Sequence, residues 1–218
     1  MRSSLIYFVV SLCFVSSQAG PITGFGAEGG LSLTYQNWDH KSDLATPLAM
    51  NNWDQHFNVG VLCQFFDYKY FNLIADIAYN QKGGLAKSAI EITQVGPDGT
   101  ILGPGPGIDL WDRIDYVSLT PRAKFKFPMG NFEPFFTIGP SFDFLVKKST
   151  SEIPPIGDVA KYELSALYGV GVGYKIDSHF NCFFEFLHQP SLTFLYSNSN
   201  LDIRNQVLKF NVGMLYQL

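Results

Sequence analysis

Residues 162–176 alternate between two kinds of side chain over fifteen positions. The first set is apolar or aromatic and comprises Tyr162, Leu164, Ala166, Tyr168, Val170, Val172, Tyr174 and Ile176. The second set is mostly small or polar and comprises Glu163, Ser165, Leu167, Gly169, Gly171, Gly173 and Lys175. A period of two indicates a β-strand, and this run is far longer than the usual strand of about 5–6 residues. Because a tilted strand needs about 9–11 residues to cross a bilayer, the run predicts a membrane-crossing strand.

The same alternation recurs along the chain, and the connections between the alternating segments differ in length. The other segments are 27–36, 56–66, 71–80, 114–127, 133–146, 180–188 and 207–218. Short connections at 67–69, 128–131 and 177–179 alternate with long ones at 37–55, 81–113, 147–161 and 189–206. Short turns at one end and long loops at the other are typical of outer-membrane barrels. The sequence therefore predicts an all-β fold, an eight-stranded antiparallel transmembrane β-barrel, as one domain over residues 20–218.

Composition excludes two classes of protein. Aromatic residues make up 16% of the chain, which argues against disorder. The formal net charge is -4, so the chain lacks the basic excess that would release counterions from nucleic-acid phosphates. We therefore expect no nucleic-acid partner.

Residues 1–19 have the pattern of a secretory signal peptide. Arg2 gives a positive start, Leu5 to Val15 are mainly apolar, and Ser17-Gln18-Ala19 supplies small residues for cleavage. The apolar run is too short to span a bilayer, although a membrane anchor or a lipoprotein signal at Cys13 are alternatives. No later apolar run is long enough for a transmembrane helix. We expect export to the bacterial outer membrane.

The composition of the polar face indicates which face meets lipid. A soluble lipocalin-like barrel also alternates, with its apolar face inward. Here the polar face is rich in Gly, Ser, Thr and Asn, whereas a water-facing surface would carry many more Lys and Glu residues. We therefore expect the apolar face to contact outer-membrane lipid. An eight-stranded barrel has room inside only for its own side chains, so a wide pore is not expected.

The polar face also carries charges of both signs, which should pair inside a narrow barrel because an unpaired buried charge is costly. They are Glu28, Asp76, Arg122, Lys124, Glu133, Glu163, Lys175, Glu185 and Lys209. A proton or ion path through a narrow channel is the alternative use of these residues.

Cys63 and Cys182 fall outward on non-adjacent strands, so no disulfide is expected.

Two segments resemble a known family. Residues 115–125, DYVSLTPRAKF, and residues 132–140, FEPFFTIGP, are similar to the PorT-like outer-membrane β-barrel family. The resemblance implies an outer-membrane barrel and no common catalytic residues. The alternating C-terminal segment 210–218 resembles the terminal signal read by the barrel-assembly machinery. Pro121, Pro134 and Pro140 lack the N–H that a strand ladder uses, so we expect an imperfect ladder around them.

An enzymatic alternative rests on three residues. His188 and Ser191, with Glu185, look similar to the Ser-His-acid set of outer-membrane lipid A deacylases, in which a carboxylate orients the imidazole. Glu185 lies on the opposite face from His188 by strand parity, so we expect no catalytic residue and no enzyme activity. The remaining histidines, His40, His56 and His179, have no metal-ligand spacing, and no cofactor is expected.

The segment 81–113 is the longest connection, and long loops are usually functional or disordered. Its Gly96-Pro97-Asp98-Gly99 turn lies between short extended runs at 88–95 and 100–102. We expect a hairpin that extends beyond the membrane and contacts a surface or envelope partner; the alternative is a cover for the barrel top.

The three tryptophans after the signal segment lie at the bases of predicted loops. We expect Trp38, Trp53 and Trp111 to be interfacial anchors, with ligand stacking as the alternative.

Overall fold

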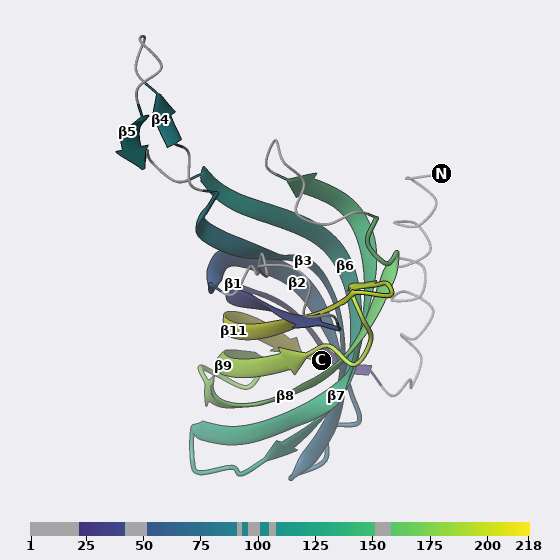
Figure 1. Ribbon diagram of the computed structural model, residues 1–218. Coiled ribbons are helices and arrows are strands. Elements are labelled where there is room, and N and C mark those ends of the chain that lie inside the picture. Colours follow the sequence, from purple (N-terminus) through teal and green to yellow (C-terminus); the bar gives the residue numbers. More distant parts are fainter. Residues whose placement is uncertain (1–21, 42–51, 91–92, 96–100, 105–107, 151–157) are drawn as a thin grey trace.

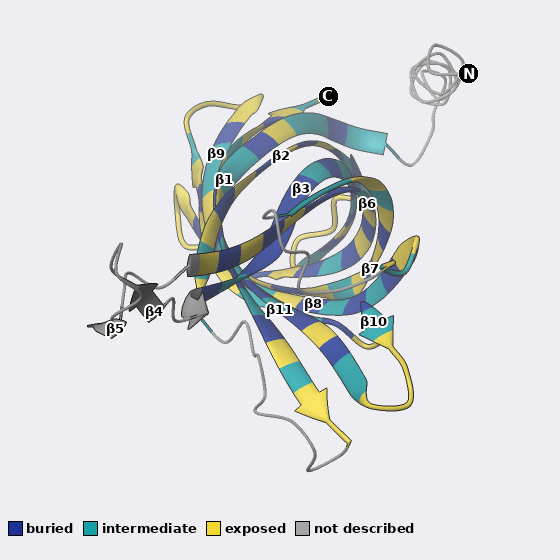
Figure 2. Ribbon diagram, turned by 45° about the horizontal axis from the view of Figure 1, so that its top comes forward, coloured by how far each residue is buried: buried dark blue, intermediate teal, exposed yellow. Residues whose placement is uncertain are grey.

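The computed structural model describes residues 22–41, 52–90, 93–95, 101–104, 108–150 and 158–218. Its wall consists of eight long antiparallel strands, in the order β1-β2-β3-β6-β7-β8-β9-β11, and pairing of β1 with β11 closes the ring (Figures 1 and 2). The eight strands are β1 (Ile22–His40), β2 (Asp54–Phe65), β3 (Phe71–Ile90), β6 (Ile108–Lys126), β7 (Phe132–Thr150), β8 (Tyr162–Lys175), β9 (Phe180–Pro190) and β11 (Leu201–Gln217). The predicted eight-stranded barrel is therefore confirmed.

Three short strands lie outside this wall. β4 (Thr93–Val95) and β5 (Ile101–Pro104) pair with each other in a separate antiparallel sheet. This small hairpin extends beyond the ends of β3 and β6 (Figure 1), as predicted, although its turn at 96–100 lies outside the described residues. β10 (Tyr196–Ser197) pairs with the start of β11.

Seven of the eight wall strands are longer than predicted, whereas β8 is one residue shorter. The long loops are correspondingly shorter. The limits predicted for the loop 81–113 are wrong, because β3 runs to Ile90 and β6 begins at Ile108. Gln81 pairs with Asp115 and Leu85 pairs with Trp111 in an unbroken continuation of the ladder. The predicted loops at 37–55, 147–161 and 189–206 lose residues to strands in the same way. Beyond the apolar belt both faces of a strand carry polar residues, so the period of two is no longer visible in the sequence.

Buried and exposed residues alternate as bands along the strands (Figure 2). Polar residues such as Ser32, Thr34 and Asn58 are buried, while Val59 and Val212 are more than half exposed on the outside. The exterior thus forms an apolar belt, and the polar residues lie in the lumen. This arrangement contradicts the soluble lipocalin-like alternative, which requires the reverse. Among the described residues, no helix is long and apolar enough to cross a membrane.

The three short turns lie at one end of the barrel, together with the start of β1 and the end of β11. In the turn before β7, Gly130 has a φ of 65°, a left-handed conformation that glycine adopts without steric cost. The β8–β9 turn is held by Asp177, whose Oδ1 accepts hydrogen bonds from the backbone N–H groups of His179 at 2.7 Å and Phe180 at 2.8 Å. Following the outer-membrane layout, this is the periplasmic end.

Two of the three predicted prolines, Pro121 and Pro140, coincide with a gap in the wall. The prediction is wrong for Pro134, which pairs with Val172 in the unbroken β7–β8 ladder. The ladder between β6 and β7 pairs Leu119 with Phe142, and its next pair is Ala123 with Ile138. Pro121 and Pro140 lie in this interval. The register is the same on both sides, so the prolines remove pairs without shifting the strands.

Cys63 on β2 and Cys182 on β9 lie on non-adjacent strands and are not joined by a disulfide. The predicted signal peptide, residues 1–19, lies outside the described residues.

Candidate functional site

The lower half of the lumen is built around one guanidinium group. Arg122 on β6 contacts three carboxylates from three other strands. Its nitrogens lie 2.9 Å from Glu185 Oε1, 3.0 Å from Glu28 Oε2 and 3.2 Å from Asp76 Oδ2. Asn211 Nδ2 donates to both Glu28 and Glu185. The Arg122 cluster therefore ties β1, β3, β6, β9 and β11 together across the interior.

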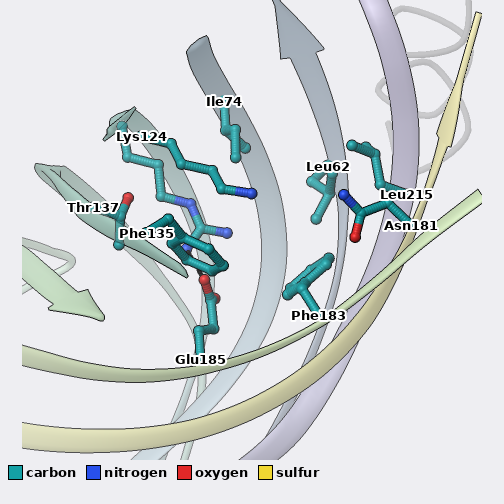
Figure 3. Close-up of a pocket in the computed structure, with 10 residues that line it drawn as sticks. Leu62, Ile74, Lys124, Phe135, Thr137, Asn181, Phe183, Glu185 and Leu215 are labelled. Atoms are coloured by element: carbon teal, nitrogen blue, oxygen red, sulfur yellow. Dashed lines mark hydrogen bonds and ion pairs between the residues drawn. The ribbon is translucent and has the colours of Figure 1, made fainter. Parts of the chain in front are cut away.

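An apolar layer lies beside this cluster, and Figure 3 shows its residues around a small pocket. Leu62, Ile74 and Leu215 form it, and Phe183 packs against them. Lys124 Nζ lies 4.0 Å from the ring centroid of Phe135 and 3.3 Å from Glu133 Oε1. The cavity among these residues and the Arg122 cluster measures only about 10 Å³, which is room for about one water molecule. No sizeable ligand fits here.

The upper lumen is built around Lys82. Its Nζ donates to Asp143 Oδ2 at 2.7 Å and to Glu163 Oε1 at 2.6 Å, and all three side chains are buried. Ser191, Asn205 and Gln189 donate further hydrogen bonds to the same two carboxylates. Above and beside this Lys82 cluster lies an apolar group of fully buried side chains, Ile114, Tyr116, Leu195 and Ile203.

Most of the predicted lumen charges are therefore confirmed as inward-facing. Lys209 Nζ donates to Asn80 Oδ1 at 3.0 Å, between the two clusters, and Lys175 lies half-buried near the periplasmic turns. The sequence does not predict Lys82 as a lumen charge, because its pattern indicates a loop over residues 81–113. Asp76 and Asn80 face the lumen, and alternate residues of a strand lie on the same face. Lys82, two residues after Asn80, therefore also belongs to the inner face.

The three residues of the enzymatic alternative are not brought together. His188 Nδ1 lies 2.8 Å from the Tyr168 hydroxyl on the outer face. Ser191 Oγ points into the lumen and donates to Glu163 at 2.6 Å, and Glu185 is engaged by Arg122. The barrel wall thus separates the histidine from the serine and from the carboxylate.

At the extracellular end, β2 leaves β3. Their ladder stops at Asn58–Asn80, and the strands touch again only at the isolated bridge Asn52–Leu85. β2 stays paired with β1 up to Asp54, while β3 stays paired with β6. This divergence opens a fork in the wall between residues 53–57 and residues 81–84.

Side chains from inside the barrel replace the missing ladder bonds at the fork. Thr34 Oγ1 donates to the carbonyl of Gly83 at 2.8 Å and accepts from the Gly83 N–H at 3.2 Å. Asp112 Oδ1 accepts from the Gly84 N–H at 2.8 Å and from Gln36 Nε2 at 3.1 Å. The Gly83 N–H and carbonyl and the Gly84 N–H are therefore satisfied without β2, as buried polar groups must be.

The fork forms a groove of about 430 Å³, within the range of small-molecule binding sites. Its lining residues are Asp54, Gln55, His56, Gln81, Leu85, Asp109, Trp111 and Arg113. His56 is buried at the fork: its Nε2 lies 3.1 Å from Asp54 Oδ2, and a Cβ added at Gly83 would come 3.1 Å from the same nitrogen. We call this site the fork groove.

The three tryptophans occupy different environments. Trp53 and Trp111 are 47% and 41% exposed at the extracellular end, as interfacial residues would be. The prediction is wrong for Trp38, which turns into the lumen, packs against the Ile114–Tyr116 group and donates from Nε1 to Gln36 Oε1 at 3.2 Å. An indole ring is apolar enough for either location, so its sequence position at a loop base does not decide between them.

Comparison with known proteins identifies the architecture. The family model described as "Outer membrane protein beta-barrel domain" matches residues 5–214. The outer membrane protein OprG from Pseudomonas aeruginosa is similar at 12% identity and a TM-score of 0.50, over 90% of this chain and 96% of that one. Neisserial surface protein A is similar at 9% identity and a TM-score of 0.49, over 89% and 97%. Ail, the attachment invasion locus protein of Yersinia pestis, solved with the heparin analogue sucrose octasulfate, is 13% identical with a TM-score of 0.40, over 90% and 99%. No curated protein matches the chain.

Proposed function

The chain belongs to the outer-membrane β-barrel family, and from this we propose that it is a non-enzymatic barrel whose extracellular end binds a partner. The observation that carries the proposal is the contrast between the two parts of the molecule. The lower lumen has a cavity of only about 10 Å³, and the outer wall is an apolar belt committed to lipid. The extracellular end, by contrast, carries both the fork groove and the hairpin formed by β4 and β5.

The extension of β3 and β6 supports a recognition role. These strands continue beyond Tyr79, which pairs with Val117, for several further pairs up to Ala86–Leu110. A loop that only shields a barrel does not need such a stiff base, whereas binding residues are commonly carried on a rigid scaffold. We propose that the segment 81–113 presents its tip to another envelope protein or to a host or matrix molecule.

The remaining proposals concern export, assembly and the membrane environment. Residues 1–19 serve as a signal peptide for export. The barrel-assembly machinery reads the alternating segment 210–218 during folding, and outer-membrane lipid surrounds the apolar belt of the folded barrel. The similarity of residues 115–125 and 132–140 to PorT-like proteins supports placement in that subgroup. No nucleic-acid partner is proposed, given the net charge of -4.

The test is to replace residues 91–107 with a short Gly-Ser turn. This change leaves β3 and β6 intact, whereas a cut at 84–108 would remove paired residues of both strands. The shortened protein should keep the heat-dependent mobility of a folded barrel on a denaturing gel but lose binding to cells or matrix. If it keeps every surface phenotype of the full-length protein, the tip is a cover and the proposal fails.

The competing function is a lipid hydrolase, for which the resemblance of His188 and Ser191 to a deacylase pair is the only argument. Because Ser191 bonds to Glu163 inside the barrel, we expect His188→Ala to leave the lipid A of a producing strain unchanged, as judged by mass spectrometry. Loss of a deacylated lipid species in that variant would establish the enzymatic function instead.

A further inference from the structure

The lining of the fork groove determines what chemistry it can bind. It combines one exposed indole, Trp111, and one aliphatic residue, Leu85, with carboxylates, amides, an imidazole and a guanidinium. Pockets for drug-like apolar ligands are lined mainly by hydrophobic side chains. An apolar ligand here would cover Asp54, Gln55 and Gln81 without giving them hydrogen bonds, and burial of unsatisfied polar groups is unfavourable.

Charge argues against an anionic ligand. Two carboxylates, Asp54 and Asp109, line the groove, whereas Arg113 is its one residue with a permanent positive charge. Arg113 Nε also lies 3.9 Å from Asp115 Oδ1, which offsets part of that charge. A phosphate or sulfate group would therefore approach two carboxylates as well as the guanidinium, and like charges at close range repel.

The groove is held in shape before any ligand arrives. Gln81 Nε2 donates to Asp115 Oδ1 at 3.2 Å, so its amide is fixed beside Arg113. His56 is fixed by Asp54, and Gln81, Trp111 and Arg113 all lie on strands that remain paired. Side chains held on rigid strands lose little freedom on binding, which favours affinity.

The height of the groove indicates where its ligand is found. The outward residues just below it, Phe57 and Tyr79, are aromatic and in contact, with ring centroids 5.8 Å apart. At the groove the outward residues Gln55, Gln81 and Arg113 are polar, and the exposed Trp53 and Trp111 lie beside them. Polar side chains mixed with tryptophans are typical of the membrane–water interface. The groove therefore lies at the level of the polar surface layer.

We propose that the fork groove binds a saccharide unit that carries no acidic group. A sugar ring has apolar C–H faces that pack on an indole, and its hydroxyl groups donate and accept hydrogen bonds in the way that carboxylate and amide side chains require. The inference rests on the proposed surface-binding function and names the ligand class at the base of the same extracellular end. The saccharide can come from the lipopolysaccharide of the same cell or from a glycan of another surface.

The experiment uses the mature chain folded in detergent micelles, with two probes. One is an array of immobilised neutral, amino and sulfated oligosaccharides; the other is lipopolysaccharide purified from the producing strain. We expect neutral or amino sugars to bind on one of the two, which identifies the source. Trp111→Ala should weaken binding at least tenfold, Gln81→Ala should weaken it severalfold, and Trp111→Phe should retain most of it.

Trp53→Ala is the matched control, because Trp53 is exposed nearby but does not line the groove; its binding should stay within twofold of wild type. Each variant must show the gel mobility of a folded barrel, and Gln81→Ala keeps the test valid if Trp111→Ala does not fold. Binding of sulfated sugars alone, no saccharide binding, or binding unchanged by both groove variants overturns the inference. Tip-dependent binding to cells would then remain as separate support for the proposed function.

Discussion

Val172 and Gly171 show how one step along a strand changes the environment of a side chain. Val172 lies on the apolar belt and is 38% exposed, whereas a Cβ added at Gly171 would overlap the ring of Phe135 in the lumen. Val172→Arg should lower the folding free energy in a bilayer because it places a charge against lipid; such a charge costs about 2–4 kcal/mol at the midplane and less toward the interface. Urea titration in lipid vesicles measures this, and a Val172→Arg variant as stable as wild type would refute the assignment of faces on β8.

Gly171→Ala tests the other side of the same wall. The added methyl group should destabilise the barrel by about 1–3 kcal/mol through overpacking. Phe135→Ala, introduced into the Gly171→Ala variant, should reduce that loss because it removes the ring that the methyl group meets. An equal effect of Gly171→Ala with and without Phe135 would place the clash elsewhere.

Asp177 makes the β8–β9 turn sensitive to acid. Hydrogen bonds from the His179 and Phe180 N–H groups hold the pKa of Asp177 below its ordinary value of 3.8. A carboxylate with a lowered pKa in the folded state stabilises it above the unfolded pKa, and this stabilisation is lost as the pH falls through the folded pKa. NMR titration should show the two amide resonances shifting together below pH 3.8. A midpoint at or above the ordinary value would contradict this role of the turn.

At the scale of elements, the period-two pattern predicts the strands only where their two faces meet different surroundings. Val59 and Val212 face lipid while Ser32 and Asn58 face the lumen, and the sequence records that contrast. Gln81-Lys82-Gly83-Gly84 continues β3 where the outside is aqueous, so both faces are polar and the strand is read as a loop. The fork is not predictable either, since Thr34 and Asp112, far away in sequence, supply the bonds that let β2 leave β3.

Lys82 shows how a single side chain links elements, because its ammonium group joins β3 to carboxylates on β7 and β8. Lys82→Met leaves Asp143 and Glu163 buried without their cation, and breaking a buried ion pair in this way costs about 3–5 kcal/mol. Unfolding by urea in vesicles measures the loss. The triple variant Lys82→Met, Asp143→Asn, Glu163→Gln should recover much of it because none of these three buried positions then carries a charge. Full stability of the single variant would show that water or another group already compensates these carboxylates.

At the scale of the whole molecule, three successive layers close the lumen to ions. From the periplasmic side these are the Leu62 layer with the Arg122 cluster, the Lys82 cluster, and the apolar group around Tyr116. An ion would have to displace paired charges in two places and then cross buried apolar side chains. We therefore expect no large steady conductance when the folded protein is inserted into a planar bilayer.

Phe183→Ala sharpens this last prediction, because it enlarges the small cavity beside Leu62 and Ile74 but leaves the two upper layers unchanged. If the layers act in series, the Phe183→Ala barrel should be as non-conducting as wild type, since opening one barrier leaves two. Steady single-channel steps in wild type would show that the paired charges of the lumen rearrange and that the barrel is a channel. Steps in Phe183→Ala alone would show that the Leu62 layer is the only effective barrier, and that ions pass the Arg122 cluster, the Lys82 cluster and the apolar group around Tyr116.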